Sequence, residues 1–305
     1  MQRYLLMRLF QAVITIFLVS ILVFVLVRLS GDPTYTLISQ DASPETREAF
    51  RRAWGLDKPV LYQYVIWVYK GLQADFGVSM LRNRPAMGLV MEHLWNTLQL
   101  VFMAMLFSVV TGMGIGIRSA VKPGGMADRV GRYFSLIGQS APTFWVGIML
   151  MLLFAATWKI LPTSGKAGFS TFLMPAFTLG WFSSAAVLRI SKSAMQDVLA
   201  SEYIKTARAM GLPRSWVIMK YALKNAAITV LTLISLQFIA LLGSTVMVEI
   251  IFAWPGIGRL AVEAIFHRDF PLIQALSMVF AVVFIAVNLL IDIAYGYLDP
   301  RIRYT

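Results

Sequence analysis

Long apolar stretches separated by polar ones dominate the hydrophobic pattern of this chain. The first, residues 9–27, would cover about 28 Å as a helix at 1.5 Å per residue, close to the roughly 30 Å hydrocarbon core of a bilayer. Because five similar stretches follow, the pattern predicts an all-α, polytopic protein with six transmembrane helices, forming one transmembrane domain over residues 1–305. The predicted spans are residues 9–27, 97–117, 133–158, 171–189, 228–248 and 273–297.

Two polar connections are long enough to fold locally. Residues 28–96 should contain two surface helices, and the second, which begins near Pro59, has an aromatic density typical of a membrane boundary. Residues 249–272 contain Trp254-Pro255-Gly256, which breaks the helical pattern. Broken backbone near membrane depth is tolerated only where it is buried in protein or lines a cavity.

Residues 195–226 form a basic, amphipathic island between two spans. Apolar positions such as Tyr203, Ile204 and Ala207 predict a helix, and Gly211-Leu212-Pro213 ends it before a second amphipathic turn begins. A folded connection of this length favours a protein docking surface. A helix lying on anionic lipid accounts for the same residue types, so both interpretations stay open.

Few polar groups interrupt the predicted spans. Gln139 and Pro142 predict a kink in the third span that either faces a water-filled path or serves packing alone. Together with Gln237 and Asn288, they are the candidates for lining a transport pathway. Asp292 is the only acid within a span, and its place near an aqueous end favours pairing with a neighbouring helix.

Composition agrees with a membrane location, since 58% of residues are hydrophobic and 14% are charged, against roughly 25% charged in soluble domains. The net charge of +12 does not indicate nucleic-acid binding, because the basic residues flank apolar spans. The absence of cysteine excludes disulfides and thiolate metal sites, and two histidines cannot form a His-rich one.

Basic residues also predict the orientation of the chain. With the long first connection set aside, the six-span arrangement leaves 15 of them on one side and 4 on the other. The positive-inside rule therefore predicts that both termini and the island of residues 195–226 are cytoplasmic.

No catalytic motif is present: there is no G-x-x-x-x-G-K-[ST], no H-E-x-x-H and no G-x-S-x-G. The chain is therefore predicted not to be an enzyme. A pore that lacks its own energy source, with a folded docking island on one side, indicates one subunit of a larger machine.

Residues 203–212 resemble the cytoplasmic EAA loop of bacterial ABC importer permeases, in the form found in the peptide, oligopeptide and nickel branch. The general EAA pattern has Glu, Ala and Ala ahead of a Gly, and these places hold Lys205, Thr206 and Ala207 ahead of Gly211. Only the last Ala and the Gly match.

Further segments are similar to that branch in the same order, so the resemblance covers nearly the whole chain. They are Arg28-Leu29-Ser30-Gly31-Asp32-Pro33, Gly55-Leu56-Asp57-Lys58-Pro59-Val60, Asp75-Phe76-Gly77-Val78-Ser79, Ala141-Pro142-Thr143-Phe144-Trp145, and residues 249–260. The long connection after the first span is similar to that of the first of the two permeases in such systems.

The resemblance implies the type I importer fold and a coupling helix that docks on an ATPase subunit. The implied coupling residues are Glu202, Tyr203, Lys205, Thr206, Ala207, Arg208, Met210, Gly211 and Leu212. The implied outer gate and docking site for a substrate-binding protein comprises Glu249, Trp254, Pro255, Gly256, Gly258 and Arg259.

The implied partners are a homologous second permease, two ATPase subunits that would bind ATP and Mg²⁺, a substrate-binding protein and the lipid of the bacterial inner membrane. This chain would hold no cofactor or metal and would bind no nucleic acid. The implied cargo is a dipeptide or oligopeptide, with nickel or glutathione as alternatives within the branch. A self-sufficient channel or secondary carrier is the alternative from another class.

Overall fold

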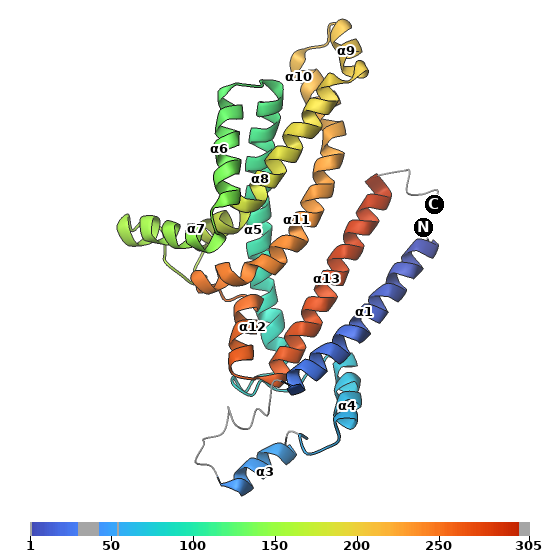
Figure 1. Cartoon of the computed structure of the whole chain (residues 1–305), viewed down its shortest axis with the longest axis vertical. Coiled ribbons are helices and arrows are strands. Elements are labelled where there is room, and N and C mark those ends of the chain that lie inside the picture. The colour runs from blue at the N-terminus through green and yellow to red at the C-terminus, as the bar shows by residue number, and fades with distance from the viewer. Residues whose placement is uncertain (1, 30–42, 54, 299–305) are drawn as a thin grey trace. The chain divides into compact units, whose positions relative to one another are not determined.

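The computed structural model describes residues 2–29, 43–53 and 55–298, which are mostly helical (Figure 1). The predicted all-α class is confirmed, because the described part of the chain has an isolated bridge between Val78 and Pro85 and no strand. The helices are α1 (Gln2–Leu29), α3 (Pro44–Ala53), α4 (Val60–Leu72), α5 (Ala86–Val121), α6 (Met126–Ser140), α7 (Thr143–Leu150), the π-helix η1 (Met151–Thr157), α8 (Ser170–Ala200), α9 (Glu202–Ala209), α10 (Arg214–Trp216), the π-helix η2 (Val217–Ala222), α11 (Leu223–Ile251), α12 (Ile257–Phe266) and α13 (Phe270–Leu298).

Within the described ranges, five helices are long and apolar enough to cross a membrane, and α6 with α7 and η1 makes a sixth candidate. This agrees with the predicted number of spans. The helices extend beyond the predicted apolar stretches: α5 begins at Ala86 rather than at residue 97, and α8 continues to Ala200 rather than ending at residue 189. Helix length includes polar turns outside the bilayer, whereas hydropathy detects only the apolar part.

The third predicted span is not one helix. The chain bends by 107° between α6 and the segment formed by α7 and η1, and Figure 1 shows α7 running almost perpendicular to α6. The break lies at Ala141, which is extended (φ −81°, ψ 129°) because Pro142 follows it. Pro142 therefore ends one helix and starts another, which is a sharper change than the predicted kink.

The chain divides into two compact units, and residues 96–255 form the second. Helix α8 is its centre, packed by α6, α7 and α11. Small residues let α5 also approach α8 closely. A Cβ added to Gly180 would lie 2.5 Å from the Ala104 carbonyl oxygen, and one added to Gly116 would lie 2.7 Å from that of Leu188. A side chain at either position would push α5 and α8 apart.

The first unit comprises residues 1–95 and 256–305. Helix α1 lies beside α13, and α4 packs on α1 through aromatic rings. The Phe24 ring meets Tyr64 edge to face at 5.3 Å, and the Tyr64 hydroxyl shares a 2.8 Å hydrogen bond with Ser20. Part of the aromatic density predicted for a membrane boundary thus packs against the first span, while Tyr62 and Tyr69 remain exposed.

Candidate functional site

The predicted coupling residues lie on α9 and the turn that follows it, residues 201–213, here called the α9 segment (Figure 1). One side of α9 is anchored in a buried apolar cluster, where Ile204 is 0% and Ala207 is 2% exposed. The other members of the cluster are Ala120, Ala194, Met195, Val217, Ala222 and Ala226. Because these residues belong to α5, α8, η2 and α11, a force applied to α9 would reach several helices of the second unit at once.

Gly211 ends α9 through its backbone conformation. Its φ of +77° is left-handed, its N–H donates to the Arg208 carbonyl (3.0 Å), and the Leu212 N–H donates to the Ala207 carbonyl (3.4 Å). These are the two hydrogen bonds of a Schellman cap, and Leu212 packs on the apolar cluster as that cap requires. No atom lies within 4 Å of an added Cβ, so glycine is required here for its φ and not for close approach.

The other side of α9 faces outward and is mostly polar. Glu202 pairs with Lys205 at 2.7 Å, with both side chains well exposed. Tyr203 is 43% exposed and Met210 is 68% exposed, so the segment presents two large apolar groups beside charges. Exposed apolar groups beside charged ones are a combination that protein interfaces use.

The predicted coupling residues therefore separate into two groups. Two of them face inward, since Ala207 is buried and Leu212 is half-buried. The exposed ones are Glu202, Tyr203, Lys205, Thr206, Arg208, Met210 and Gly211. The principal inward anchor, Ile204, was counted in the helical pattern but was not predicted as a site residue.

The predicted outer gate residues of the second unit are interior groups. Trp254 and Glu249 are each 0% exposed. The Thr97 hydroxyl donates to the Glu249 carboxylate at 2.5 Å, and the Trp254 ring meets Phe172 edge to face at 4.6 Å. Neither side chain is available on the surface to a docking protein.

Asn96 links the turn at Trp254 and Pro255 to the start of the second unit. Its side-chain N–H donates to the Pro255 carbonyl (2.9 Å), and its own carbonyl accepts the Trp254 indole N–H (3.1 Å). Lys166 donates to the side-chain oxygens of Asn96 and Gln99, at 2.6 Å each. Two loops distant in sequence are therefore tied to α5 at Asn96 and Gln99.

The remaining predicted gate residues belong to the first unit. Gly256 precedes α12 in extended conformation and, like Gly258, is buried, while Arg259 is exposed. Of the six predicted docking residues, Arg259 alone is exposed and Pro255 is half-buried.

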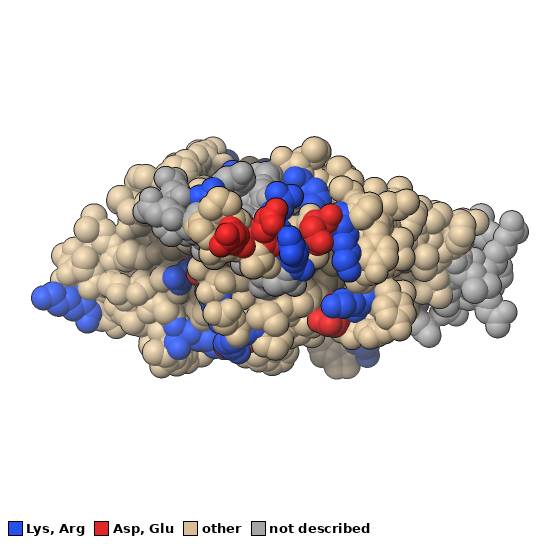
Figure 2. Space-filling model, turned by 90° about the horizontal axis from the view of Figure 1, so that it is seen from below, with Lys and Arg blue, Asp and Glu red and all other residues tan. Residues whose placement is uncertain are grey.

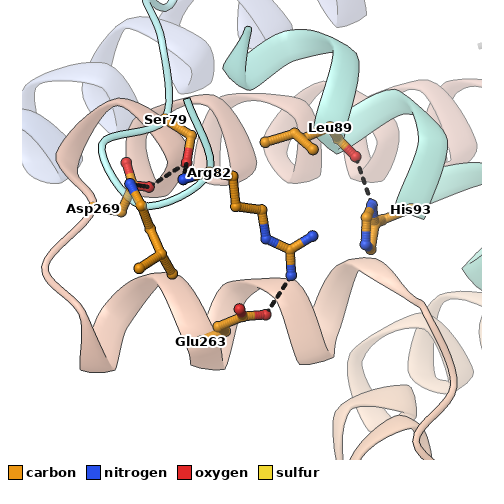
Figure 3. Close-up of polar contacts among 7 residues, drawn as sticks. Ser79, Arg82, Leu89, His93, Glu263 and Asp269 are labelled. Carbon is orange, nitrogen blue, oxygen red and sulfur yellow. Dashed lines mark hydrogen bonds and ion pairs between the residues drawn. The ribbon is translucent and has the colours of Figure 1, made fainter. Parts of the chain in front are cut away.

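A polar network in the first unit holds the chain between α4 and α5 against α12 and α13 (Figure 3). Asp269 is fully buried, and it accepts hydrogen bonds from the Ser79 hydroxyl (2.5 Å) and the Leu81 N–H (3.2 Å). Arg82 pairs with Glu263 at 2.6 Å with about a third of each side chain exposed. His93 shares a 2.8 Å hydrogen bond with the Leu89 carbonyl of its own helix.

The end of the first unit that carries α3 has mixed charge. Helix α3 contains Glu45 and Glu48 beside Arg47, Arg51 and Arg52. Figure 2, seen from that end, shows acidic and basic side chains intermixed near the middle of the face. This end therefore offers a partner paired charges rather than a field of one sign.

The candidate pathway residues occupy different places. Gln139 is exposed near the end of α6, where its side-chain oxygen accepts a 2.8 Å hydrogen bond from Arg189 of α8. Pro142 is exposed at the break before α7, and Gln237 is half-buried on α11. Asn288 belongs to the first unit, where it donates to the Phe284 carbonyl of its own helix.

Several polar groups were not predicted from sequence. Asp128 is buried, and it binds Lys192 at 2.6 Å and the Gly124 N–H at 3.0 Å. An acid close to the end of an apolar segment is a weak signal by itself, and its partner lies 64 positions away in sequence. The segment containing Ser79 was singled out, but its acceptor Asp269 was not. The side chain of Asp292 and the segment 30–33 of the first-span motif lie outside the described residues.

Comparison with protein families accounts for nearly the whole chain. Residues 112–304 match the family described as binding-protein-dependent transport system inner membrane component, and residues 1–101 match the N-terminal domain of such membrane components. Type I importer permeases share the fold: an amino acid ABC transporter aligns at a TM-score of 0.55 and 17% identity, covering 69% of this chain and 94% of that one. The MetNI methionine ABC transporter aligns at a TM-score of 0.57 and 16% identity, covering 70% of this chain and 97% of that one.

Two curated relatives match from end to end. The glutathione transport system permease protein GsiC of Escherichia coli K12 is 37% identical over 305 residues, covering 100% of both chains. The protein of the same name from Salmonella choleraesuis is 38% identical with the same coverage. The chain thus belongs to the family of binding-protein-dependent transport system inner membrane components, and it is a multi-pass permease subunit of an ABC importer in the bacterial inner membrane.

Proposed function

We propose that this permease, with a homologous second permease, forms the membrane path of an importer for glutathione or another small peptide, driven by two separate ATPase subunits. The cargo is inferred from end-to-end identity of 37% and 38% with permeases named for glutathione transport. No cofactor is assigned to this chain, and ATP and Mg²⁺ would bind to the ATPase subunits.

The observation that carries the proposal is the two-sided construction of the α9 segment. Its exposed side offers Tyr203, Met210 and a charged pair to a partner, while Ile204 and Ala207 fix its other side within the second unit. A helix anchored in this way moves with the helices beneath it. When ATP closes the ATPase pair, displacement of the α9 segment would therefore move α5, α8 and α11.

In this proposal α9 and both chain termini lie in the cytoplasm, as the distribution of basic residues predicts. A substrate-binding protein would then dock at the outer connections of the two units. The buried turn at Trp254 would support that outer surface rather than contact the binding protein itself.

Site-specific crosslinking tests the coupling assignment. Because the natural chain has no cysteine, Met210→Cys introduces its only thiol. In membranes with candidate ATPase subunits coexpressed, we expect this thiol to crosslink to an ATPase subunit. Capture of phospholipid alone, with no ATPase subunit, would refute the docking assignment.

The matched control is Met126→Cys. Met126 is 76% exposed against 68% for Met210, and it lies at the start of α6 rather than on α9. Equal crosslinking from both positions would indicate that the ATPase subunit contacts exposed thiols generally and does not dock at the α9 segment. Uptake of labelled glutathione by the assembled transporter, with its binding protein present, tests the cargo separately.

A further inference from the structure

Arg189 is a cation within the long helix α8, and its partner is an uncharged group. One of its guanidinium nitrogens, Nη1, donates to the Gln139 side-chain oxygen at 2.8 Å, and both side chains are exposed on the second unit. No carboxylate pairs with Arg189 in the part of the chain that the structure describes. Its positive charge is therefore not neutralised within those residues.

Asp128, the acid that binds the neighbouring cation of α8, is already engaged. Lys192, one turn further along α8, binds the Asp128 carboxylate at 2.6 Å. Asp128 also accepts the Gly124 N–H at 3.0 Å and lies 3.5 Å from Arg132. Lys192 is thus balanced by an acid while Arg189, on the same helix, is not.

The helix directions explain how Arg189 meets Gln139. Gly138 packs at Trp181 and Gly131 packs at Leu188, so α6 and α8 run antiparallel. Helical side chains lean toward the N-terminus of their own helix. Arg189 therefore leans toward the Ser170 end of α8, away from the end that carries α9, and Gln139 leans back to meet it.

An arginine that only anchors a span extends toward the nearer lipid headgroups. With α9 in the cytoplasm, as proposed above, Arg189 instead leans away from the cytoplasmic headgroups and bonds Gln139, three residues before the break at Pro142. Charged groups within the membrane cost free energy unless they are paired or lie in a water-filled path. A mobile anion that passes this position would supply the missing charge.

We propose that Arg189 and Gln139 form a binding site for a carboxylate of the transported solute. The guanidinium presents several N–H donors in a plane that fits a carboxylate. The Gln139 oxygen is occupied by its bond from Arg189, while the amide N–H groups of Gln139 remain as donors, so both side chains offer N–H groups to an anion. This inference rests on the proposed function, and it narrows the cargo to solutes with at least one carboxylate.

Three substitutions separate a binding role from a packing role. Arg189→Gln removes the charge. Gln139→Glu keeps the shape but places a carboxylate beside Arg189, so the chain itself would neutralise the site. If the pair only joins α6 to α8, Gln139→Glu strengthens it and transport stays normal; if the pair binds the solute, Gln139→Glu blocks it. Arg118→Gln is the control, because Arg118 is also an exposed arginine near the end of a span and donates to the Gly114 carbonyl of its own helix.

The experiment measures ATP-driven glutathione uptake by the assembled transporter in two kinds of vesicle. One is pure phosphatidylcholine, and in the other phosphatidylglycerol replaces a quarter of the lipid. A charged hydrogen-bonded contact corresponds to about a tenfold change. We expect about that loss with Arg189→Gln and with Gln139→Glu in both kinds of vesicle, and a change of less than about twofold with Arg118→Gln. Protein yield and the thermal unfolding midpoint check that each variant is folded.

Normal uptake by either Arg189→Gln or Gln139→Glu would overturn the inference. An equal loss of uptake with Arg118→Gln would also overturn it, because that result would indicate a general effect of charge. A loss of uptake seen only in vesicles with phosphatidylglycerol would overturn it too, because Arg189 would then bind a lipid phosphate in place of the solute. Failure of the wild-type transporter to take up glutathione would instead overturn glutathione as the cargo, and the same comparison of variants would then be made with a labelled dipeptide, which also carries a carboxylate.

Discussion

The α9 segment and the turn at Trp254 both belong to motifs that predicted contact with partner proteins, yet they use their side chains in opposite ways. The α9 segment buries two apolar anchors, Ile204 and Ala207, and exposes most of its motif. The Trp254 turn buries its largest groups and has little exposed side chain within the second unit. Motifs that both predict contact with a partner can therefore differ, one exposing most of its side chains and the other burying them.

The largest expected effect is on stability, and it tests whether buried Trp254 supports the turn around it. Trp254→Ala removes a fully buried ring that packs on Phe172 and bonds Asn96, so it should lower the free energy of unfolding by about 3–5 kcal/mol. Thermal unfolding in detergent measures this. The control Trp158→Ala, at a side chain 55% exposed, should change stability much less. Similar losses at both positions would contradict a special role for the buried turn.

The next effect tests whether buried Asp269 stabilises the connection between α4 and α5 in the first unit. Asp269→Ala leaves the buried Ser79 hydroxyl without this acceptor and should cost about 1–3 kcal/mol. We expect faster proteolysis of the chain between α4 and α5. Asp57→Ala, at an exposed acid, serves as the control. Unchanged proteolysis in Asp269→Ala would show that Asp269 does not fix this connection.

A smaller effect separates backbone conformation from bulk in the α9 segment. Gly211→Val must adopt a left-handed φ and should cost about 1–2 kcal/mol, whereas Gly211→Asn tolerates that φ and should cost less. Uptake and the unfolding midpoint should both be highest with Gly, lower with Asn and lowest with Val at position 211. If Asn were as damaging as Val, bulk at the docking surface rather than φ would be the cause, although the surrounding space is open.

The smallest effect concerns the exposed face of α9. Lys205→Ala removes an ion pair whose two side chains are 61% and 87% exposed, so the free energy of unfolding should change by less than about 1 kcal/mol. If the α9 segment docks on an ATPase, the same variant should still weaken ATPase association, which pull-down from detergent would measure. A large loss of stability would mean that this face is part of the packing.

Much of the fold could be predicted because hydropathy is local. A run of apolar residues of bilayer length specifies a helix wherever it occurs, so the all-α class and the number of spans followed from the pattern. Gly211 and Pro213 likewise predicted the end of α9, because the φ of glycine and the missing N–H of proline act on their own neighbours. The length of α5 and the 107° bend at Pro142 were not predicted, since a proline in an apolar run fits both a kink and a break.

Burial and pairing were decided only by tertiary structure. The sequence by itself determined that Trp254, Glu249, Ala207 and Ile204 lie in helix ends, turns or amphipathic helices. Which of them face inward depends on residues far away in the chain, such as Thr97 for Glu249 and the α5, α8 and α11 residues around Ile204. The partners of Asp269 and Arg189 are also remote in the sequence, 190 and 50 positions away. Chain-local rules cannot specify such contacts, because they form only when separate helices pack together.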